Sequence, residues 1–173
     1  MQDLLQAHGR YDVVCYGPDG KEKWRDVIDN LVTTQGKNYA LDTYLAMGAG
    51  GVTHMGLISS TSFSALAATD TAAQINGSNG WKEANTTGNT PTYTGNRKIC
   101  TWSAASAGTK ALTIGLLFSF SGAGTVKGGF ITIGSTSTPG ATTGFLYSAG
   151  LFTSGDRVVA IFDTIQVSYT ASL

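Results

Sequence analysis

The sequence predicts a mainly β protein, an antiparallel β-sandwich or jelly roll that carries an N-terminal arm and hairpin and one short α-helix. The closing stretch from Ile165 to Leu173 alternates apolar and small polar residues, and the stretch from Leu112 to Phe120 does the same. This alternation is the period of a strand with one buried face and one solvated face. Clusters of Gly, Ser and Thr separate the runs, and no crossover helices lie between them, which favours antiparallel pairing.

The composition limits both the size of the fold and its partners. A chain of 173 residues is one domain, large enough to bury a core without disulfides or metals. Its 11 basic and 11 acidic residues give a net charge of zero, so no basic field attracts nucleic acid. No apolar run reaches the length of a membrane span, and the first residues lack the pattern of a secretory signal. We therefore expect no nucleic-acid partner, no membrane partner and synthesis in the cytoplasm.

Charged residues are scarce and unevenly placed. They make up 13% of the chain, about half the share that is usual in soluble domains. Such a weakly self-repelling surface favours a protein that works inside an assembly. Residues 1–42 hold 12 of the 22 charges. This shift separates a first unit, residues 1–32, from a β-sandwich body, residues 33–173.

The first unit consists of an arm and a β-hairpin. The arm runs from Met1 to Arg10 and has no evident strand partner in the body. The hairpin strands Tyr11–Tyr16 and Glu22–Ile28 flank the segment Gly17-Pro18-Asp19-Gly20. In this segment Pro presets φ and Gly accepts the positive φ of a tight turn.

The body opens with the helix, near residues 33–47. Thr33 and Thr34 supply an N-cap, and Gly48 ends the apolar pattern. The other elements are strands, placed around a loop-rich region at 60–95. We expect these strands at Met55–Ser59, Arg97–Trp102, Ala111–Phe120, Thr125–Ile133, Gly144–Phe152, Arg157–Phe162 and Ile165–Leu173.

Two side-chain patterns follow from these elements. On the helix, we expect an exposed Lys37 and an apolar side that packs on the body, formed by Leu41, Tyr44 and Leu45. On the strand Ala111–Phe120, alternation places Thr113 and Ser119 on the solvated face. The expected buried residues of that strand are Leu112, Ile114, Leu116, Phe118 and Phe120.

Residues with reactive side chains form no catalytic pattern. Cys15 and Cys100 are too few and too far apart for a disulfide framework or a zinc site, so we expect two buried free thiols. His8 and His54 lack the spacing of metal ligands, and the glycine-rich run at 122–129 lacks the spacing of a phosphate loop. The serines lack the frame of a nucleophile, and no two carboxylates form a facing pair. We expect no catalytic residue, no metal and no cofactor, and therefore a protein that is not an enzyme.

A series of short motifs carries a resemblance that spans nearly the whole chain. In order, they are Asn30–Asp42 (NLVTTQGKNYALD), Met55–Ser59 (MGLIS), Trp81–Glu83 (WKE), Tyr93 before Arg97, Gly128–Ile131 (GGFI) and Gly144–Phe152 (GFLYSAGLF) before Arg157. With these motifs the chain resembles virion proteins of tailed bacteriophages, the group that includes capsid cement or decoration proteins. The resemblance implies a β-sandwich or jelly-roll body that locks onto the capsid shell and has no catalytic residues.

The residues and the resemblance together predict a structural virion protein of the capsid cement or decoration type. We expect it on the outer capsid surface, bound to the major capsid protein, as a homo-oligomer in which a dimer is favoured and a trimer is the alternative. An extended arm of ten residues reaches up to about 33 Å, enough to cross onto a neighbouring subunit. The expected capsid-binding residues are Leu4, Leu5, Arg10 and Trp24.

Two other functions stay open at this point. Related β domains also occur in tail and fibre parts, so a tail or head-fibre component is the alternative within the virion. The other alternative is a carbohydrate-binding β-sandwich module for attachment to a host surface. Trp24, Trp81 and Trp102 could line a sugar platform for it, although a place in the core is the commoner role of such side chains. The arm, in turn, could be a frayed terminus or a short helix packed on its own body.

Overall fold

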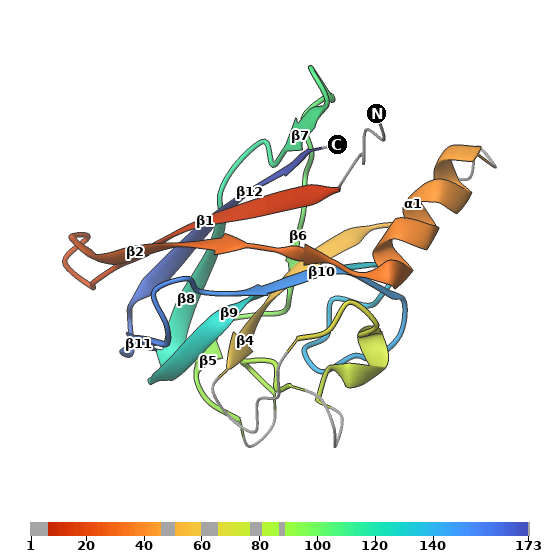
Figure 1. The fold of residues 1–173 in the computed structure, drawn as a ribbon. Coiled ribbons are helices and arrows are strands. Elements are labelled where there is room, and N and C mark those ends of the chain that lie inside the picture. Colours follow the sequence, from red (N-terminus) through yellow and green to blue (C-terminus); the bar gives the residue numbers. More distant parts are fainter. Residues whose placement is uncertain (1–6, 46–50, 60–65, 77–80, 87–88, 173) are drawn as a thin grey trace.

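The structure, a computed structural model, describes the chain except for residues 1–6, 46–50, 60–65, 77–80, 87–88 and 173 and the side chains of residues 41, 42, 44 and 45. Two antiparallel sheets pack face to face, and a helix lies beside them (Figure 1). The predicted mainly β fold, with its antiparallel sandwich and short helix, is confirmed.

The first sheet, called sheet A, contains both ends of the described chain. Its strand order is β2-β1-β12-β8-β5, and β7 also pairs with β12. β1 and β12 pair along their whole length, from His8 opposite Ser172 to Tyr16 opposite Thr164. The strands of sheet A are β1 (His8–Tyr16), β2 (Glu22–Asp29), β5 (Thr92–Tyr93), β7 (Thr109–Ala111), β8 (Leu116–Gly122) and β12 (Thr164–Ser172).

The second sheet, called sheet B, is built from one short early strand and from the middle and later parts of the chain. Its strand order is β3-β10-β9-β4-β6, and β11 also pairs with β9. The strands of sheet B are β3 (Leu31–Val32), β4 (Thr53–Ser59), β6 (Lys98–Ile99), β9 (Gly124–Ile133), β10 (Phe145–Leu151) and β11 (Arg157–Val159). The helix is α1 (Thr34–Leu45), and a short 3-10 turn, η1, covers Ala72–Gln74.

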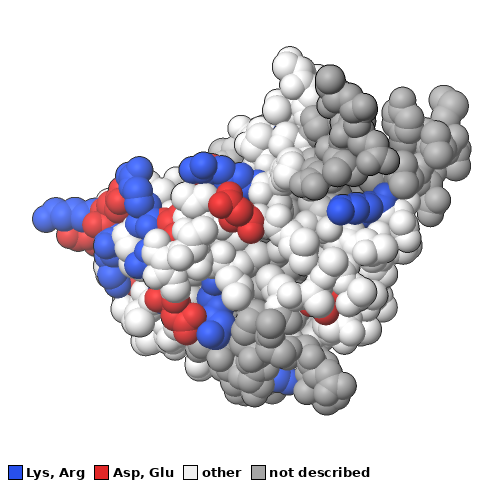
Figure 2. All heavy atoms as spheres, in the orientation of Figure 1, with Lys and Arg blue, Asp and Glu red and all other residues white. Residues whose placement is uncertain are grey.

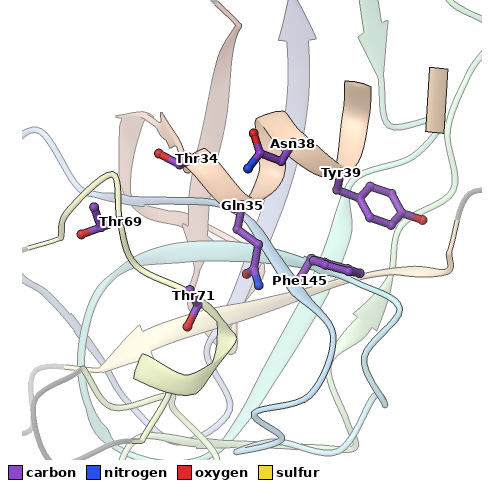
Figure 3. A pocket seen from close by; sticks show the side chains of 7 residues that line it. All are labelled: Thr34, Gln35, Asn38, Tyr39, Thr69, Thr71 and Phe145. Atoms are coloured by element: carbon purple, nitrogen blue, oxygen red, sulfur yellow. The ribbon is translucent and has the colours of Figure 1, made fainter. Parts of the chain in front are cut away.

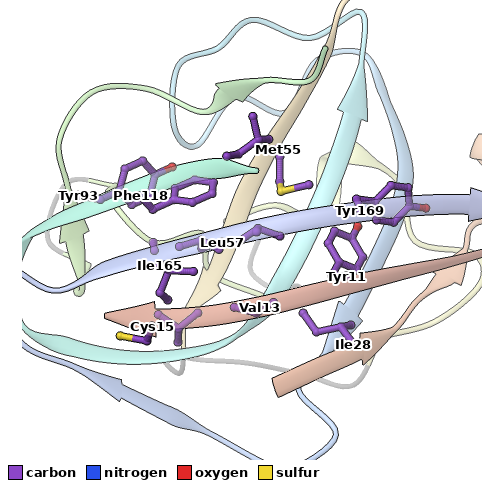
Figure 4. Close-up of a cluster of buried hydrophobic side chains, with 14 of the residues drawn as sticks. Tyr11, Val13, Cys15, Ile28, Met55, Leu57, Tyr93, Phe118, Ile165 and Tyr169 are labelled. Atoms are coloured by element: carbon purple, nitrogen blue, oxygen red, sulfur yellow. The ribbon is translucent and has the colours of Figure 1, made fainter. Parts of the chain in front are cut away.

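The main core lies between the two sheets (Figure 4). Alternation along β8 decides which of its side chains enter this core, as predicted: Phe118 and Phe120 are buried, whereas Ser119 is exposed. The predicted burial of Ile114 is wrong, because the expected single strand is divided into β7 and β8. Ile114 lies in the gap between them and is 69% exposed.

A second apolar cluster covers the other face of sheet B. Phe130 of β9 packs against Trp81 of the central loop region, with 5.0 Å between the ring centroids. Leu146 of β10 belongs to the same cluster, and α1 packs on β10. Sheet B is therefore buried on both faces, whereas sheet A keeps an outer face with exposed side chains such as Leu117 and Ser168.

The start of α1 follows from its sequence. Thr33 caps the helix as predicted, because its Oγ1 accepts a hydrogen bond from the backbone N–H of Gly36 at 3.0 Å. Gly36 lets the helix approach β10 closely, since a Cβ at this position would lie 2.4 Å from the carbonyl oxygen of Tyr147. Lys37 is exposed as predicted, whereas the expected packing of Leu41, Tyr44 and Leu45 lies outside the described residues.

The N-terminal hairpin is a part of sheet A, which corrects the predicted boundary between an N-terminal unit, residues 1–32, and a separate body. β1 lies between β2 and β12, so it is an interior strand of the sandwich. The predicted arm is also shorter than expected. Residues His8–Arg10 pair with Thr170–Ser172, so the expectation that the arm has no strand partner is wrong for these three residues.

Candidate functional site

The structure separates the two predicted capsid-binding residues that it describes. Arg10 is exposed on β1, and its Nε donates a hydrogen bond to Asp12 Oδ1 at 3.0 Å. Arg10 lies opposite Asp29 at one end of the hairpin, whereas Trp24 lies opposite Cys15 near the other end. The two residues therefore form no common site. Leu4 and Leu5 lie outside the described residues.

Trp24 connects the two sheets instead of lying free on the surface. Its indole Nε1 donates a hydrogen bond to the carbonyl oxygen of Val158 at 3.1 Å. The ring meets the edge of Phe152 with 5.7 Å between centroids, and the Arg157 guanidinium lies 5.6 Å from the ring centroid. Trp24 thus ties β2 of sheet A to β11 of sheet B.

A buried carboxylate holds Arg157 against Trp24. Asp26 accepts hydrogen bonds from Arg157 Nε at 2.7 Å, from Thr153 Oγ1 at 3.0 Å and from the backbone N–H of Val27 at 2.7 Å. Burial alone would raise the pKa of Asp26, but these donors outweigh it and hold the pKa below its usual value. The carboxylate is therefore ionised at neutral pH and keeps Arg157 in place.

The chain after β11 makes a tight turn at Ala160–Asp163. The backbone N–H of Asp163 donates to the Ala160 carbonyl oxygen at 3.2 Å, and Phe162 adopts φ 69°. A positive φ at the third position of a turn favours Gly or Asn and is strained for a bulky side chain. Two backbone hydrogen bonds join the turn to Phe120 of β8: the Phe162 N–H donates to the Phe120 carbonyl oxygen at 2.8 Å, and the Phe120 N–H donates to the Asp163 carbonyl oxygen at 2.8 Å. The turn is thus fixed to β8.

The carboxylate of Asp163 anchors this turn from inside. Its side chain is fully buried, and Oδ2 accepts hydrogen bonds from the Ala160 N–H at 2.7 Å and from Lys23 Nζ. The ion pair to Lys23 therefore links the turn to the N-terminal hairpin.

Burial and the nearby Asp163 charge raise the pKa of Cys15 to about 11, so this thiol stays protonated at neutral pH. Cys15 and Cys100 are both buried and free, as predicted.

Three apolar side chains protrude from this anchored segment, and we call them the apolar turn: Val158, Ile161 and Phe162. Their exposed fractions are 68%, 46% and 75%. An exposed aromatic side chain on a strained backbone that hydrogen bonds hold in place is typical of binding sites, where a fold maintains strain for a function. The apolar turn is the candidate functional site.

The sequence contained no signal for the apolar turn. The run Arg157–Phe162 has the composition of a buried strand, and we predicted one. The structure ends β11 at Val159, because the Asp163 carboxylate accepts the Ala160 N–H and closes the turn. An apolar run alone does not distinguish a buried strand from an exposed turn.

Charge is unevenly distributed over the visible face of the molecule. Charged side chains gather at the end of the molecule that carries the β1–β2 hairpin, and most of the remaining visible surface is uncharged (Figure 2). Within the described ranges, His, Cys, Asp and Glu form no group of three that could hold a metal ion. No helix among the described residues is long and apolar enough to cross a membrane.

Similarity to other proteins was sought in three ways. Comparisons of the chain with protein-family models, with curated proteins and with solved structures found no significant match in any of the three, so similarity assigns the chain to no family.

Proposed function

We propose that the chain is a non-enzymatic structural virion protein of the capsid decoration type, which binds the major capsid protein on the outer surface of a tailed-phage shell. The observation that carries this proposal is the apolar turn. A partner that covers Val158, Ile161 and Phe162 removes three exposed apolar side chains from water. The resemblance of the sequence to tailed-phage virion proteins names the class of partner.

The anchored backbone makes the apolar turn suitable for this role. Binding costs free energy when loops and side chains must be ordered. The backbone of the turn is already fixed by Asp163 and by the hydrogen bonds to Phe120, so little ordering remains. A contact made by three side chains binds weakly on its own. A homo-oligomer that places two or three copies on neighbouring capsid subunits binds the capsid much more tightly than one copy does.

The uncovered face of sheet A is the proposed contact between copies of the chain. One row across it is uncharged, with Leu117 of β8 beside Gln166 of β12 and Gln166 opposite Val14 of β1, and Arg25 of β2 borders this row. Introducing a charge with Leu117→Lys should shift the protein from a dimer to a monomer in analytical ultracentrifugation. A wild-type chain that sediments as a monomer at all concentrations would rule out this contact.

The N-terminal residues remain a proposed second contact, through Leu4 and Leu5. Because β1 begins at His8, the deletion that tests them is Met1 to Ala7. Removing residues 8–10 as well would take away part of the β1–β12 ladder. The shorter deletion should leave the stability of the sandwich unchanged and weaken attachment to capsids.

Capsid binding is tested by cosedimentation of the purified chain with capsids that were assembled without it. Phe162→Ala should raise the apparent Kd by about tenfold or more, as expected for the loss of one central aromatic contact. Ile99→Ala is the matched control, because Ile99 is 60% exposed on β6. Equal binding by wild type and Phe162→Ala would remove the apolar turn from the interface. Failure of the wild-type chain to bind such capsids would overturn the proposed function itself.

A further inference from the structure

A pocket with a volume of about 360 Å³ lies where the start of α1 meets β10 and the segment that leads into η1 (Figure 3). Tyr39 and Phe145 stand on one side of it and Thr69 and Thr71 on the other, with Gln35 between them. A volume of this size is at the lower end of the range for small-molecule sites. It is large enough for a small ring-shaped ligand.

The walls of the pocket are fixed by hydrogen bonds between separate elements. The backbone N–H of Thr34 donates to the Ala68 carbonyl oxygen at 2.8 Å, which joins the helix to the segment before η1. The backbone N–H of Leu146 donates to Gln35 Oε1 at 2.7 Å, which joins the helix to β10. The site is therefore preformed, and little free energy is lost in ordering it when a ligand binds.

Several polar side-chain groups face the pocket without a partner among the described residues. Gln35 uses its Oε1 for Leu146, which leaves its Nε2 donors available. The side chains of Thr34, Asn38 and Thr69 likewise form no hydrogen bond with a described residue. The pocket thus offers amide and hydroxyl groups, which both donate and accept hydrogen bonds.

The described lining of the pocket contains no charged side chain. Asp70 is next in sequence to two lining residues, but its Oδ2 accepts the backbone N–H of Ala67 at 3.0 Å and so faces its own loop. A phosphate, carboxylate or ammonium ligand would find no countercharge here. A purely apolar ligand would cover the amides and hydroxyls without satisfying them, which is unfavourable.

An aromatic surface completes the site. Phe145 is 40% exposed, and its ring lies 4.8 Å from the Tyr39 ring with 44° between the planes. The hydroxyl oxygen of Tyr39 accepts a hydrogen bond from the backbone N–H of Gly51 at 2.6 Å, so the Tyr39 ring is held in place beside Phe145. An aromatic ring beside amides suits a ligand with one C–H face and a rim of hydroxyl groups.

We propose that this pocket binds a neutral pyranoside, with its hydroxyl groups on Gln35 and Asn38 and its C–H face on Phe145. This inference goes beyond the proposed capsid contact, because the apolar turn shares no residue with the pocket. It also replaces the tryptophan platform considered from the sequence. Trp81 is fully buried, Trp24 joins the two sheets, and Trp102 is half-buried with its Nε1 donating to Thr53 Oγ1 at 2.8 Å.

The test is a titration of the full-length ¹⁵N-labelled chain followed by NMR. The probes are the methyl glycopyranosides of glucose, galactose and mannose, with glucuronate and N-acetylneuraminate as charged comparisons. A neutral glycoside should shift the amide signals of Asn38, Thr69 and Leu146. Phe145→Ala should weaken its binding roughly tenfold, the effect of about 1.4 kcal/mol expected for one aromatic contact.

Two further variants keep the result interpretable if Phe145→Ala disturbs folding. Asn38→Ala changes an exposed helix position and should weaken binding severalfold while the fold is kept. Phe162→Ala removes an exposed Phe elsewhere and should leave glycoside binding unchanged, whereas it weakens capsid binding. Phe145→Ala should show the reverse pattern, so the two proposals fail separately.

Binding to immobilised bacterial surface polysaccharide distinguishes a cell-surface ligand from a free sugar. Binding that the free methyl glycoside competes away supports the site and identifies a cell-surface ligand. Binding of the free glycoside alone supports the site and identifies a free sugar. The proposal is overturned if no neutral glycoside shifts the pocket signals, if the charged sugars bind more tightly, or if a peptide of the capsid protein occupies the pocket in their place.

Discussion

The carboxylate of Glu83 and the guanidinium of Arg97 form a two-point ion pair in which both side chains are fully buried. Arg97 Nε donates to Glu83 Oε1 at 2.8 Å, and its second nitrogen donates to Oε2 at 2.7 Å. The backbone N–H of Gly140 also donates to Glu83, and Arg97 donates to the Ala141 carbonyl oxygen at 2.9 Å. The pair thus connects the central loop region to the loop between β9 and β10.

Removing one member of this pair should destabilise the fold strongly. Glu83→Gln leaves the Arg97 charge buried without a countercharge, and we expect the free energy of unfolding to fall by about 3–5 kcal/mol. Urea denaturation measures the change. The control is Glu22→Gln, which removes the charge of an exposed partner of Arg25 and should leave the midpoint unchanged. Similar midpoints for both variants would mean that the Glu83–Arg97 pair does not hold these loops.

Gly36→Ala should destabilise the chain although Ala favours a helix more than Gly does. The added Cβ would meet the Tyr147 carbonyl oxygen at 2.4 Å, so α1 must move away from β10. Overpacking of this kind costs about 1–3 kcal/mol, which exceeds the gain of about 1 kcal/mol in helix propensity. Thermal unfolding checks the sign. Asn38→Ala on the exposed side of the same helix is the control and should not lower Tm. An unchanged or higher Tm for Gly36→Ala would mean that the helix does not lie this close to β10.

Phe162→Gly should separate stability from binding. Gly adopts φ 69° without the strain that Phe162 carries, and the lost side chain is mostly exposed. We expect the free energy of unfolding to stay the same or to rise by up to ~1 kcal/mol, while capsid binding falls. Chemical denaturation and cosedimentation measure the two effects. A clear loss of stability would contradict the view that Phe162 is retained at this position for binding.

Asp26 should contribute to stability in a pH-dependent way. Its folded-state pKa lies below the value for the unfolded chain, so its contribution is present above the unfolded pKa, near 3.9. It is lost as the pH falls through the folded-state pKa. At neutral pH, Asp26→Asn should lower the free energy of unfolding by about 1–3 kcal/mol, because Arg157 loses its charged acceptor.

The pH series provides the check on Asp26. The difference in unfolding free energy between wild type and Asp26→Asn should be constant near pH 7 and should shrink below about pH 4. Urea denaturation at a series of pH values measures it. A difference that is the same at pH 7 and in acid would show that the charge on Asp26 contributes nothing.

The sequence predicted the strands in which buried and exposed residues alternate. It did not predict the apolar turn. β8 and β12 carry one buried and one exposed face, and this two-residue period is visible in the sequence. β4 and β9 are buried on both faces, so their apolar runs indicate a strand but not what covers it. The apolar turn depends on the Asp163 carboxylate and its contacts with Lys23, which is 140 residues away in the chain. A single sequence contains no record of such a distant pairing.

The pairing of β1 with β12 sets the order in which the molecule can be completed during synthesis. His8 lies opposite Ser172, so β1 cannot complete its pairing until β12 has left the ribosome. Until then, β1 has only β2 beside it, and β8 lacks its β12 neighbour. Contacts between residues so far apart in sequence form slowly and leave strand edges open in the meantime. The nascent chain therefore passes through a period in which half of its sandwich is unfinished.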